Sequence, residues 1–149
     1  MKKFIGLFAL AGIAVFMLVG CASVPMAPKD RDLAAKSFTP KPGKAQIYVY
    51  RNETLGSAVR MVVSLDGRVI GQTGAKTFFW WEVEPGEHKI SSHTENTADI
   101  VLKTEPDKLY FVWQEVKMGM WGPRSLLHQV DEETGKLGVM ECELIQPEK

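Results

Sequence analysis

The sequence lacks the short motifs that mark several common hydrolase classes. It contains no Gly-x-Ser-x-Gly, no His-Glu-x-x-His and no Ser-x-x-Lys. It has three histidines, and His88 and His93 stand five positions apart on one expected strand. Their side chains should therefore point to opposite faces and cannot bind one metal ion. We predict no catalytic residues, no metal site and no cofactor, although a Ser-His-Asp set that is assembled by folding, with His128 as its base, stays open.

The sequence also lacks an excess of charge of one sign. It carries 18 basic and 18 acidic residues, and without Lys2 and Lys3 the balance becomes 16 to 18. The basic residues between Arg51 and Lys136 are scattered among carboxylates and form no cluster. Binding to nucleic acid needs a basic face that neutralises phosphates. We therefore predict no nucleic-acid partner.

The N-terminus, in contrast, has a distinct pattern. Two lysines precede an apolar run over residues 4–19, which is the arrangement of a secretion signal. The run ends in the tetrapeptide LVGC at residues 18–21, which resembles the lipobox of bacterial lipoproteins. That resemblance implies removal of residues 1–20, acylation of the Cys21 sulfur by chains such as palmitate, and acylation of the freed amine.

An uncleaved transmembrane helix is the alternative for this segment, since the run approaches the minimum spanning length of about 17 residues. The glycines within the run and the lipobox-type cysteine favour the cleaved signal. In enteric-type lipoproteins, an Asp after the lipidated cysteine resembles a signal for retention in the inner membrane. Here Ala22 and Ser23 follow Cys21, and this Asp is absent. We expect the protein on the periplasmic face of the outer membrane, attached through the lipid on Cys21, with an envelope protein as a further expected partner.

Cys142 is the second of two cysteines in the chain. If Cys21 is a thioether, it cannot form a disulfide, and Cys142 is then a lone thiol outside the cytoplasm. Such a thiol is either a buried small hydrophobe or an intermolecular bridge. We expect burial, because Met140, Cys142 and Leu144 alternate with two glutamates along an expected strand.

Residues 21–43 have the composition of a linker. Four prolines interrupt a run of Ala, Ser, Lys and Asp with little aliphatic content, and a flexible chain of this length would reach about 25 Å. Residues 30–37 could form a turn or two of helix, which is marginal alone. We therefore predict a lipoprotein signal peptide at 1–20, a lipidated cysteine and proline-containing linker at 21–43, and a folded domain at 44–149.

In the folded part, apolar residues recur every two positions rather than every 3.6. The pair Asp66-Gly67 favours a two-residue hairpin, and residues 77–83 are apolar on both faces, as in a central strand that is covered on both sides. Residues 131–138 should form a turn or a short helix before a last strand at 139–145. Seven or eight short strands at this spacing predict a single all-β, antiparallel β-sandwich-like domain.

Several short stretches of the domain are similar to an uncharacterised bacterial lipoprotein family, known mainly as a domain of unknown function. They are PGKAQIYVYR at 42–51, Asp-Gly at 66–67, Pro-Gly-Glu-His at 85–88 and Lys-Leu-Tyr-Phe at 108–111. The resemblance covers about residues 42–145, and residues 65–88 also resemble PEGA-type surface β-domains. Asp107 stands where a glycine is expected. No catalytic residues are established for that family, so the resemblance assigns none to this chain.

The tryptophans fall into two groups. Trp80, Trp81 and Trp113 lie in expected strands, so we predict that they pack in the core. Trp121 lies in the loop 118–123, where two glycines and a proline prevent regular structure. This loop either folds over the open end of the sandwich or presents Met118, Met120 and Trp121 to a partner or a bilayer, since methionine and tryptophan suit interfaces.

These features predict a lipid-anchored protein of the bacterial cell envelope. Its small β-domain should act in binding or structural support, with the three side chains of the loop 118–123 as the candidate contact. A small envelope hydrolase and an inhibitor-type module that occludes an envelope enzyme are the alternatives. An enzyme would need a concave pocket with convergent polar groups, whereas a binding module would expose an apolar patch or a free sheet edge.

Overall fold

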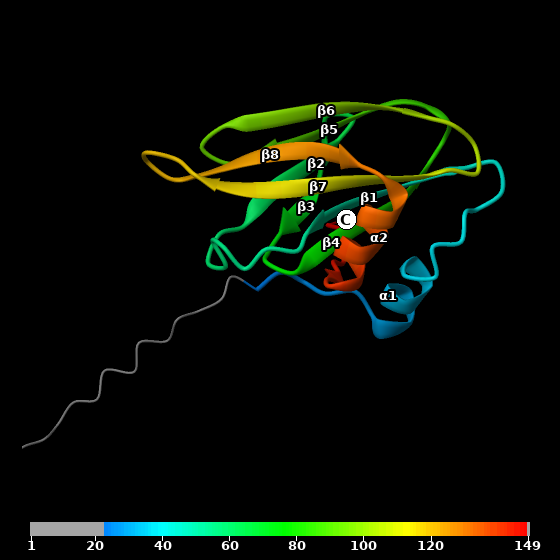
Figure 1. Ribbon diagram of the computed structural model, residues 1–149, viewed down its shortest axis with the longest axis horizontal. Helices are drawn as coiled ribbons and strands as arrows, with labels where there is room; N and C mark the ends of the chain where they lie inside the picture. The colour runs from blue at the N-terminus through cyan, green and yellow to red at the C-terminus, as the bar shows by residue number, and fades with distance from the viewer. Residues whose placement is uncertain (1–22, 149) are drawn as a thin grey trace, which may run out of the picture.

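The computed structural model describes residues 23–148, which form two β-sheets with two short helices against one of them (Figure 1). The five-stranded sheet has the order β8-β7-β1-β4-β9, and the four-stranded sheet has the order β3-β2-β5-β6. The predicted all-β sandwich-like fold is confirmed. In chain order the elements are α1 (Lys29–Ala35), β1 (Ala45–Arg51), β2 (Met61–Leu65), β3 (Arg68–Thr73), β4 (Thr77–Val83), β5 (Gly86–His93), β6 (Thr97–Thr104), β7 (Leu109–Met118), β8 (Pro123–Val130), α2 (Glu132–Met140) and β9 (Glu143–Leu144).

The main hydrophobic core lies between the two sheets. Ile47 and Val49 of β1 point into it and are fully buried, as the alternation of this strand predicts. The second sheet contributes Val63 of β2 and Ile90 of β5 to the same cluster. Burying one such side chain stabilises the fold by about 1.5–3 kcal/mol, so the alternating positions hold the two sheets together.

A second core fills the space between the five-stranded sheet and the two helices. Tyr48, on the other face of β1, stacks on Phe111 of β7 with 4.8 Å between the ring centroids. Both side chains are almost fully buried, and so are Phe78 and Phe79 on the two faces of β4. Strands β1 and β4 are therefore covered on both sides at these positions, as predicted for β4.

Two strand pairs differ from the expected antiparallel arrangement. Strand β1 pairs with β7 in parallel, from Gln46 opposite Leu109 to Tyr50 opposite Trp113, and β4 pairs with β9 in parallel. The chain between β1 and β7 passes through the second sheet, which supplies the long crossover that a parallel pair requires. Strands β1 and β7 therefore run in the same direction and end at the same end of the sandwich.

The C-terminal segment is more helical than predicted. Helix α2 includes most of the expected turn or short helix and also the start of the expected strand at 139–145, which shortens to the two residues of β9. Asp131 caps α2, because its side chain accepts a hydrogen bond from the backbone N of Thr134 at 2.9 Å. Alternation near residue 140 therefore reflects the end of a helix and the turn after it.

Two glycines allow α2 to lie close to the sheet. A Cβ atom at Gly135 would lie 2.1 Å from Cγ of Phe111, and one at Gly138 would lie 2.1 Å from Cε2 of Tyr50. Glycine is a poor helix former. Close packing onto two aromatic rings, which no local pattern reveals, therefore decides the conformation of this segment.

The segment predicted as a linker instead packs against the domain from residue 23 onward. Ala35 of α1 is fully buried, and its carbonyl accepts a hydrogen bond from the Tyr48 hydroxyl at 2.8 Å. The backbone N of Ala27 donates to the carbonyl of Leu144 at 2.9 Å. Four prolines suggested an extended chain, but prolines also suit the short extended pieces that flank α1.

Trp80, Trp81 and Trp113 pack against the two cores, as predicted, although each stays half-buried. Trp81 stacks on Phe79 with 5.2 Å between the ring centroids.

Over residues 23–148, no helix has the length and apolarity needed to cross a bilayer.

Candidate functional site

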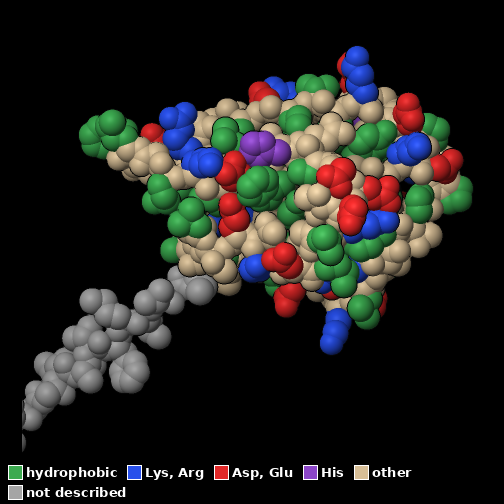
Figure 2. Space-filling model, in the orientation of Figure 1, with side chains coloured by type: hydrophobic (Ala, Val, Ile, Leu, Met, Phe, Trp, Pro, Cys, Tyr) green, Lys and Arg blue, Asp and Glu red, His purple; other side chains and the backbone are tan. Residues whose placement is uncertain are grey.

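The end of β7 and the turn that follows it carry the most exposed large apolar side chains of the described chain. Met118 and Pro123, predicted to lie in an irregular loop, instead pair as the last residue of β7 and the first of β8. Met118 is 67% exposed, Met120 85% and Trp121 87%. Figure 1 shows the β7–β8 hairpin projecting past the rest of the sandwich, and Figure 2 shows hydrophobic side chains at this projecting end. The loop therefore does not fold over the open end of the sandwich, and that alternative of the sequence analysis is wrong. We call residues 118–123 the hairpin tip.

The hairpin tip has a defined backbone rather than a loose one. The backbone N of Gly119 donates to the carbonyl of Gly122 at 2.8 Å, and the backbone N of Glu95 donates to the carbonyl of Pro123 at 3.2 Å. A Cβ atom at Gly119 would lie 2.5 Å from Oε2 of Glu95 and 2.7 Å from the carbonyl oxygen of Gly122. The glycine thus permits a tight turn whose base is held by the β5–β6 loop. This turn presents Met120 and Trp121 to solvent.

Two cations lie directly opposite each other at the base of the hairpin tip. Lys117 of β7 pairs in register with Arg124 of β8, and like charges placed in this way destabilise a sheet. Glu115 compensates in part, because its carboxylate lies 2.5 Å from Nζ of Lys117 and 2.8 Å from Nε2 of His128. The hydrogen bond from Lys117 lowers the pKa of Glu115, and that carboxylate raises the pKa of Lys117. None of the ion pairs among residues 23–148 includes Arg124.

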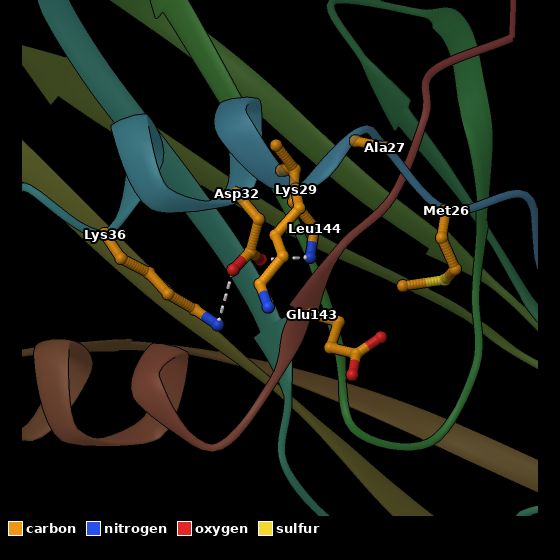
Figure 3. A pocket seen from close by; sticks show the side chains of 7 residues that line it. All are labelled: Met26, Ala27, Lys29, Asp32, Lys36, Glu143 and Leu144. Atoms are coloured by element: carbon orange, nitrogen blue, oxygen red, sulfur yellow. Dashed lines mark hydrogen bonds and ion pairs between the residues drawn. The ribbon is translucent and has the colours of Figure 1, made fainter.

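A pocket opens where α1 crosses β9 (Figure 3). Its polar side chains come from α1, from the C-cap residue of α1 and from β9. It is lined by Met26, Ala27, Lys29, Asp32, Lys36, Glu143 and Leu144. Nothing in the sequence of residues 21–43, whose composition predicts a linker, indicates this pocket.

The pocket's central carboxylate already has a structural task. Asp32 accepts a hydrogen bond from the backbone N of Leu144 at 2.8 Å and forms an ion pair with Lys36 at 2.9 Å, as Figure 3 shows. Two ammonium groups and two carboxylates balance each other in the lining, which contains neither a hydroxyl side chain nor an imidazole. The arrangement fixes α1 onto β9.

The histidines make separate contacts. Nε2 of His93 lies 2.8 Å from the Ser64 hydroxyl, and its Nδ1 lies 3.2 Å from the Thr97 hydroxyl. His128 contacts Glu115, and His88 lies 2.7 Å from Asp66. Ser64 and His93 thus have the spacing of a nucleophile and its base. The position beyond the imidazole, where a Ser-His-Asp set has a carboxylate, is taken by a neutral hydroxyl.

The remaining sequence predictions fall on Cys21 and Cys142. Cys21 lies outside the described residues. Cys142 is buried, as predicted, and burial raises the pKa of its thiol to about 12. A thiol in this state is a weak nucleophile. Across residues 23–148, no three His, Cys, Asp or Glu side chains come together in a way that could hold a metal ion.

Comparison with known proteins gives a family without an assigned activity. A family model described as "Protein of unknown function (DUF2846)" matches residues 41–124, which include the whole hairpin tip. The chain is also 37% identical over 137 residues to an uncharacterized protein of Haemophilus influenzae, an alignment that covers 89% of this chain and 82% of that protein. No solved structure matches the chain.

Proposed function

The chain belongs to the DUF2846 family of proteins of unknown function, and we propose that it is a lipid-anchored protein of the bacterial cell envelope that binds through its hairpin tip. The observation that carries this proposal is the exposure of Met118, Met120 and Trp121 together on one projecting turn. Exposed apolar clusters of this kind mark sites of protein or membrane contact. The lipobox-like residues 18–21 support the anchor.

The anchor can be tested by intact-mass analysis of the protein from cell envelopes. We expect loss of residues 1–20 and an added mass of two or three acyl chains on Cys21, because stable anchoring takes about two lipid signals. A Cys21→Ser variant is the matched control and should keep residues 1–20 and gain no lipid. A mature wild-type protein with a free Cys21 thiol would overturn the proposal.

The expected outer-membrane location has its own test. Density-gradient fractionation of an enteric host should place the wild-type protein with outer-membrane markers. An Ala22→Asp variant should move toward the inner-membrane fractions, because an Asp after the lipidated cysteine resembles a retention signal. Identical distributions of the two proteins would contradict this sorting.

A small hydrolase is the second candidate function, and one observation favours it. Ser64 and His93 are within hydrogen-bond distance at 2.8 Å. A fluorophosphonate probe should label the purified protein if this pair is reactive, and Ser64→Ala should abolish the labelling. Ser91→Ala, on the neighbouring strand β5, should leave the labelling intact. Absence of labelling in the wild-type protein would remove this candidate.

A further inference from the structure

One end of the sandwich brings together segments that are far apart in the sequence. Strands β1 and β7 are parallel, and β4 is antiparallel to β1, so the ends of β1 and β7 and the start of β4 share this end. Ser23 and Val24 line a hollow with Ala75 and Lys76, at the turn before β4. Figure 1 shows the hairpin tip, the β1–β2 loop and the start of the described chain toward the left of the molecule. We define the tip end as residues 23–24, 52–60, 74–76 and 118–123.

The chain enters the domain at the tip end and is fixed there. Val24 is 8% exposed, and the carbonyl of Pro25 accepts a hydrogen bond from the backbone N of Gln146 at 2.8 Å. Met26 forms a β-bridge with Ile145. On the proposed function, on which this inference rests, the lipid is attached to Cys21. Only two residue steps then separate the anchor from Ser23, and two steps span at most about 7 Å.

This short connection changes how the domain can sit. A flexible linker of 22 residues would let the domain leave the membrane surface by about 25 Å, whereas a connection of about 7 Å keeps the tip end at the level of the lipid headgroups. The apolar side chains of that end would then meet the bilayer continually. A lipid surface is thus the partner that the point of attachment brings to them.

The β1–β2 loop adds an apolar side chain to the tip end, and a buried arginine holds the loop in place. Leu55 is 52% exposed. Arg51 is fully buried beneath the loop and donates hydrogen bonds from Nη1 to the carbonyl of Val59 at 2.8 Å and from Nη2 to the carbonyl of Gly56 at 2.7 Å. The loop also contacts the hairpin, because the backbone N of Val116 donates to Glu53 Oε2 at 2.8 Å. The β1–β2 loop and the β7–β8 hairpin are thus joined at the tip end.

Two cations and two carboxylates lie around the base of the hairpin tip: Glu115 is paired with Lys117, and the Glu95 carboxylate lies beside Gly119. Among residues 23–148 no ion pair includes Arg124, so this cation is available to a lipid phosphate. Lys117 and Arg124 oppose each other just behind the apolar turn, which places two cations at the depth of the headgroups when the turn enters the interface. Cations near a membrane surface are attracted to anionic lipid, and tryptophan is enriched at the membrane–water interface. An apolar turn with cations behind it matches the layers of a membrane surface, where the apolar region lies deeper than the headgroup phosphates.

We infer that the tip end is a membrane-contact face: the sandwich stands on the bilayer with Met120 and Trp121 in the headgroup region, Leu55 beside them, and Lys117 and Arg124 against lipid phosphates. The opposite end of the sandwich, which includes the β4–β5 and β6–β7 turns, then faces away from the membrane. The partner of the hairpin tip is the lipid surface that already holds the anchor.

Site-specific labelling of the lipidated full-length protein tests this orientation. The protein is reconstituted into vesicles of phosphatidylethanolamine and phosphatidylglycerol, and the environment-sensitive fluorophore NBD is attached at Met120→Cys or Leu55→Cys. Cys142 is buried, so wild-type protein measures the background labelling. Leu137→Cys on α2 is the matched control, because Leu137 is 65% exposed and lies outside the tip end.

We expect NBD at positions 120 and 55 to show a blue shift and stronger emission on vesicles, while NBD at 137 keeps the spectrum it has in water. A water-like spectrum at 120 in protein that floats with the vesicles and carries the acyl mass would overturn the inference alone. Equal shifts at 120 and 137 would also overturn it. A label at 120 that is shielded in native envelopes but not in vesicles would assign the tip to a protein partner. Protein without the acyl mass would overturn the proposed function, and the inference with it.

Discussion

The second core around Tyr48 and the hairpin tip are two clusters of large apolar side chains with opposite surroundings. Around Tyr48, the rings of Phe78 and Phe111 are almost fully buried between the five-stranded sheet and the helices. At the hairpin tip, Met120 and Trp121 are more than four-fifths exposed. The first cluster holds the fold together, and the second contributes little to it. An apolar side chain that the fold does not use is available for a contact outside the molecule.

The two clusters also differ in what positions them. The buried cluster depends on small residues in α2, which allow the helix to approach Tyr50 and Phe111. The hairpin tip depends on Gly119, which allows a tight turn against Glu95. Glycine thus serves inward packing in one region and outward presentation in the other. Substitutions in the two regions should therefore separate stability from binding.

The largest expected effect comes from truncation inside the buried cluster. Phe111→Ala should lower the free energy of unfolding by about 3–5 kcal/mol, because it removes a ring that stacks on Tyr48 and leaves a cavity. Urea denaturation monitored by circular dichroism measures this change. A loss below about 1 kcal/mol would show that the helices do not close this core.

Overpacking beneath α2 should have the next largest effect. Gly138→Ala places a Cβ atom within 2.1 Å of Cε2 of Tyr50 and should cost about 1–3 kcal/mol, as expected for an overfilled core. Gly122→Ala is the matched control at the hairpin tip, where the nearest atom to a new Cβ is Glu95 Oε2 at 3.8 Å. Thermal melts of both variants should differ clearly, and equal midpoints would contradict the observed helix packing.

The close packing at Gly138 and the open space at Gly122 cannot be predicted from the sequence around each glycine. Alternation and turn chemistry predicted the strands and the Asp66-Gly67 hairpin, whose two residues have φ values of 51° and 81°. Those signals are local. A turn or short helix at 131–138 was also predicted, and Asp131 caps it locally. The parallel pairing of β1 with β7, the extension of α2 to Met140 and the packing of residues 23–43 depend on contacts between distant segments, which no local pattern contains.

The candidate site shows the same division. The two glycines and the proline of residues 118–123 predicted an irregular loop with three large side chains, and the structure adds their exposure. The sequence could not show that Ser23 and the hairpin tip share one end, because that depends on sheet order. The Ser64–His93 pair was missed for the same reason, since a register between β2 and β5 brings the two residues together.

Alkaline pH should weaken the buried cluster modestly. Burial raises the pKa of Cys142 to about 12, whereas an unfolded thiol has a pKa of about 8.5. Because the folded pKa is the higher one, the unfolded state loses its proton first, and stability that is complete below pH 8.5 is lost as pH rises toward 12. Between pH 8 and 9.5 we expect a loss of about 1 kcal/mol.

Denaturation series at several pH values measure this loss, and a Cys142→Ala variant is the control. The variant should show a weaker dependence on pH than the wild-type protein over the same range. Identical slopes of stability against pH in the two proteins would show that the thiol contributes nothing to the alkaline loss. The tyrosines would then be the next groups to test, because burial also raises the pKa of Tyr50 to about 12.

The smallest effect on stability is expected at the hairpin tip. Trp121→Ala should change the free energy of unfolding by less than about 0.5 kcal/mol, because a side chain that is 87% exposed makes few native contacts. Leu137→Ala, at a position that is 65% exposed on α2, should be equally mild. Only the first variant should alter the membrane contact, which fluorescence of NBD at position 55 on vesicles reports. If Trp121→Ala instead lost several kcal/mol of stability, the indole would be part of the fold. If the variant left the NBD spectrum at position 55 unchanged on vesicles, the indole would make no membrane contact. Either result would contradict the separation between a cluster that stabilises the fold and a cluster that binds.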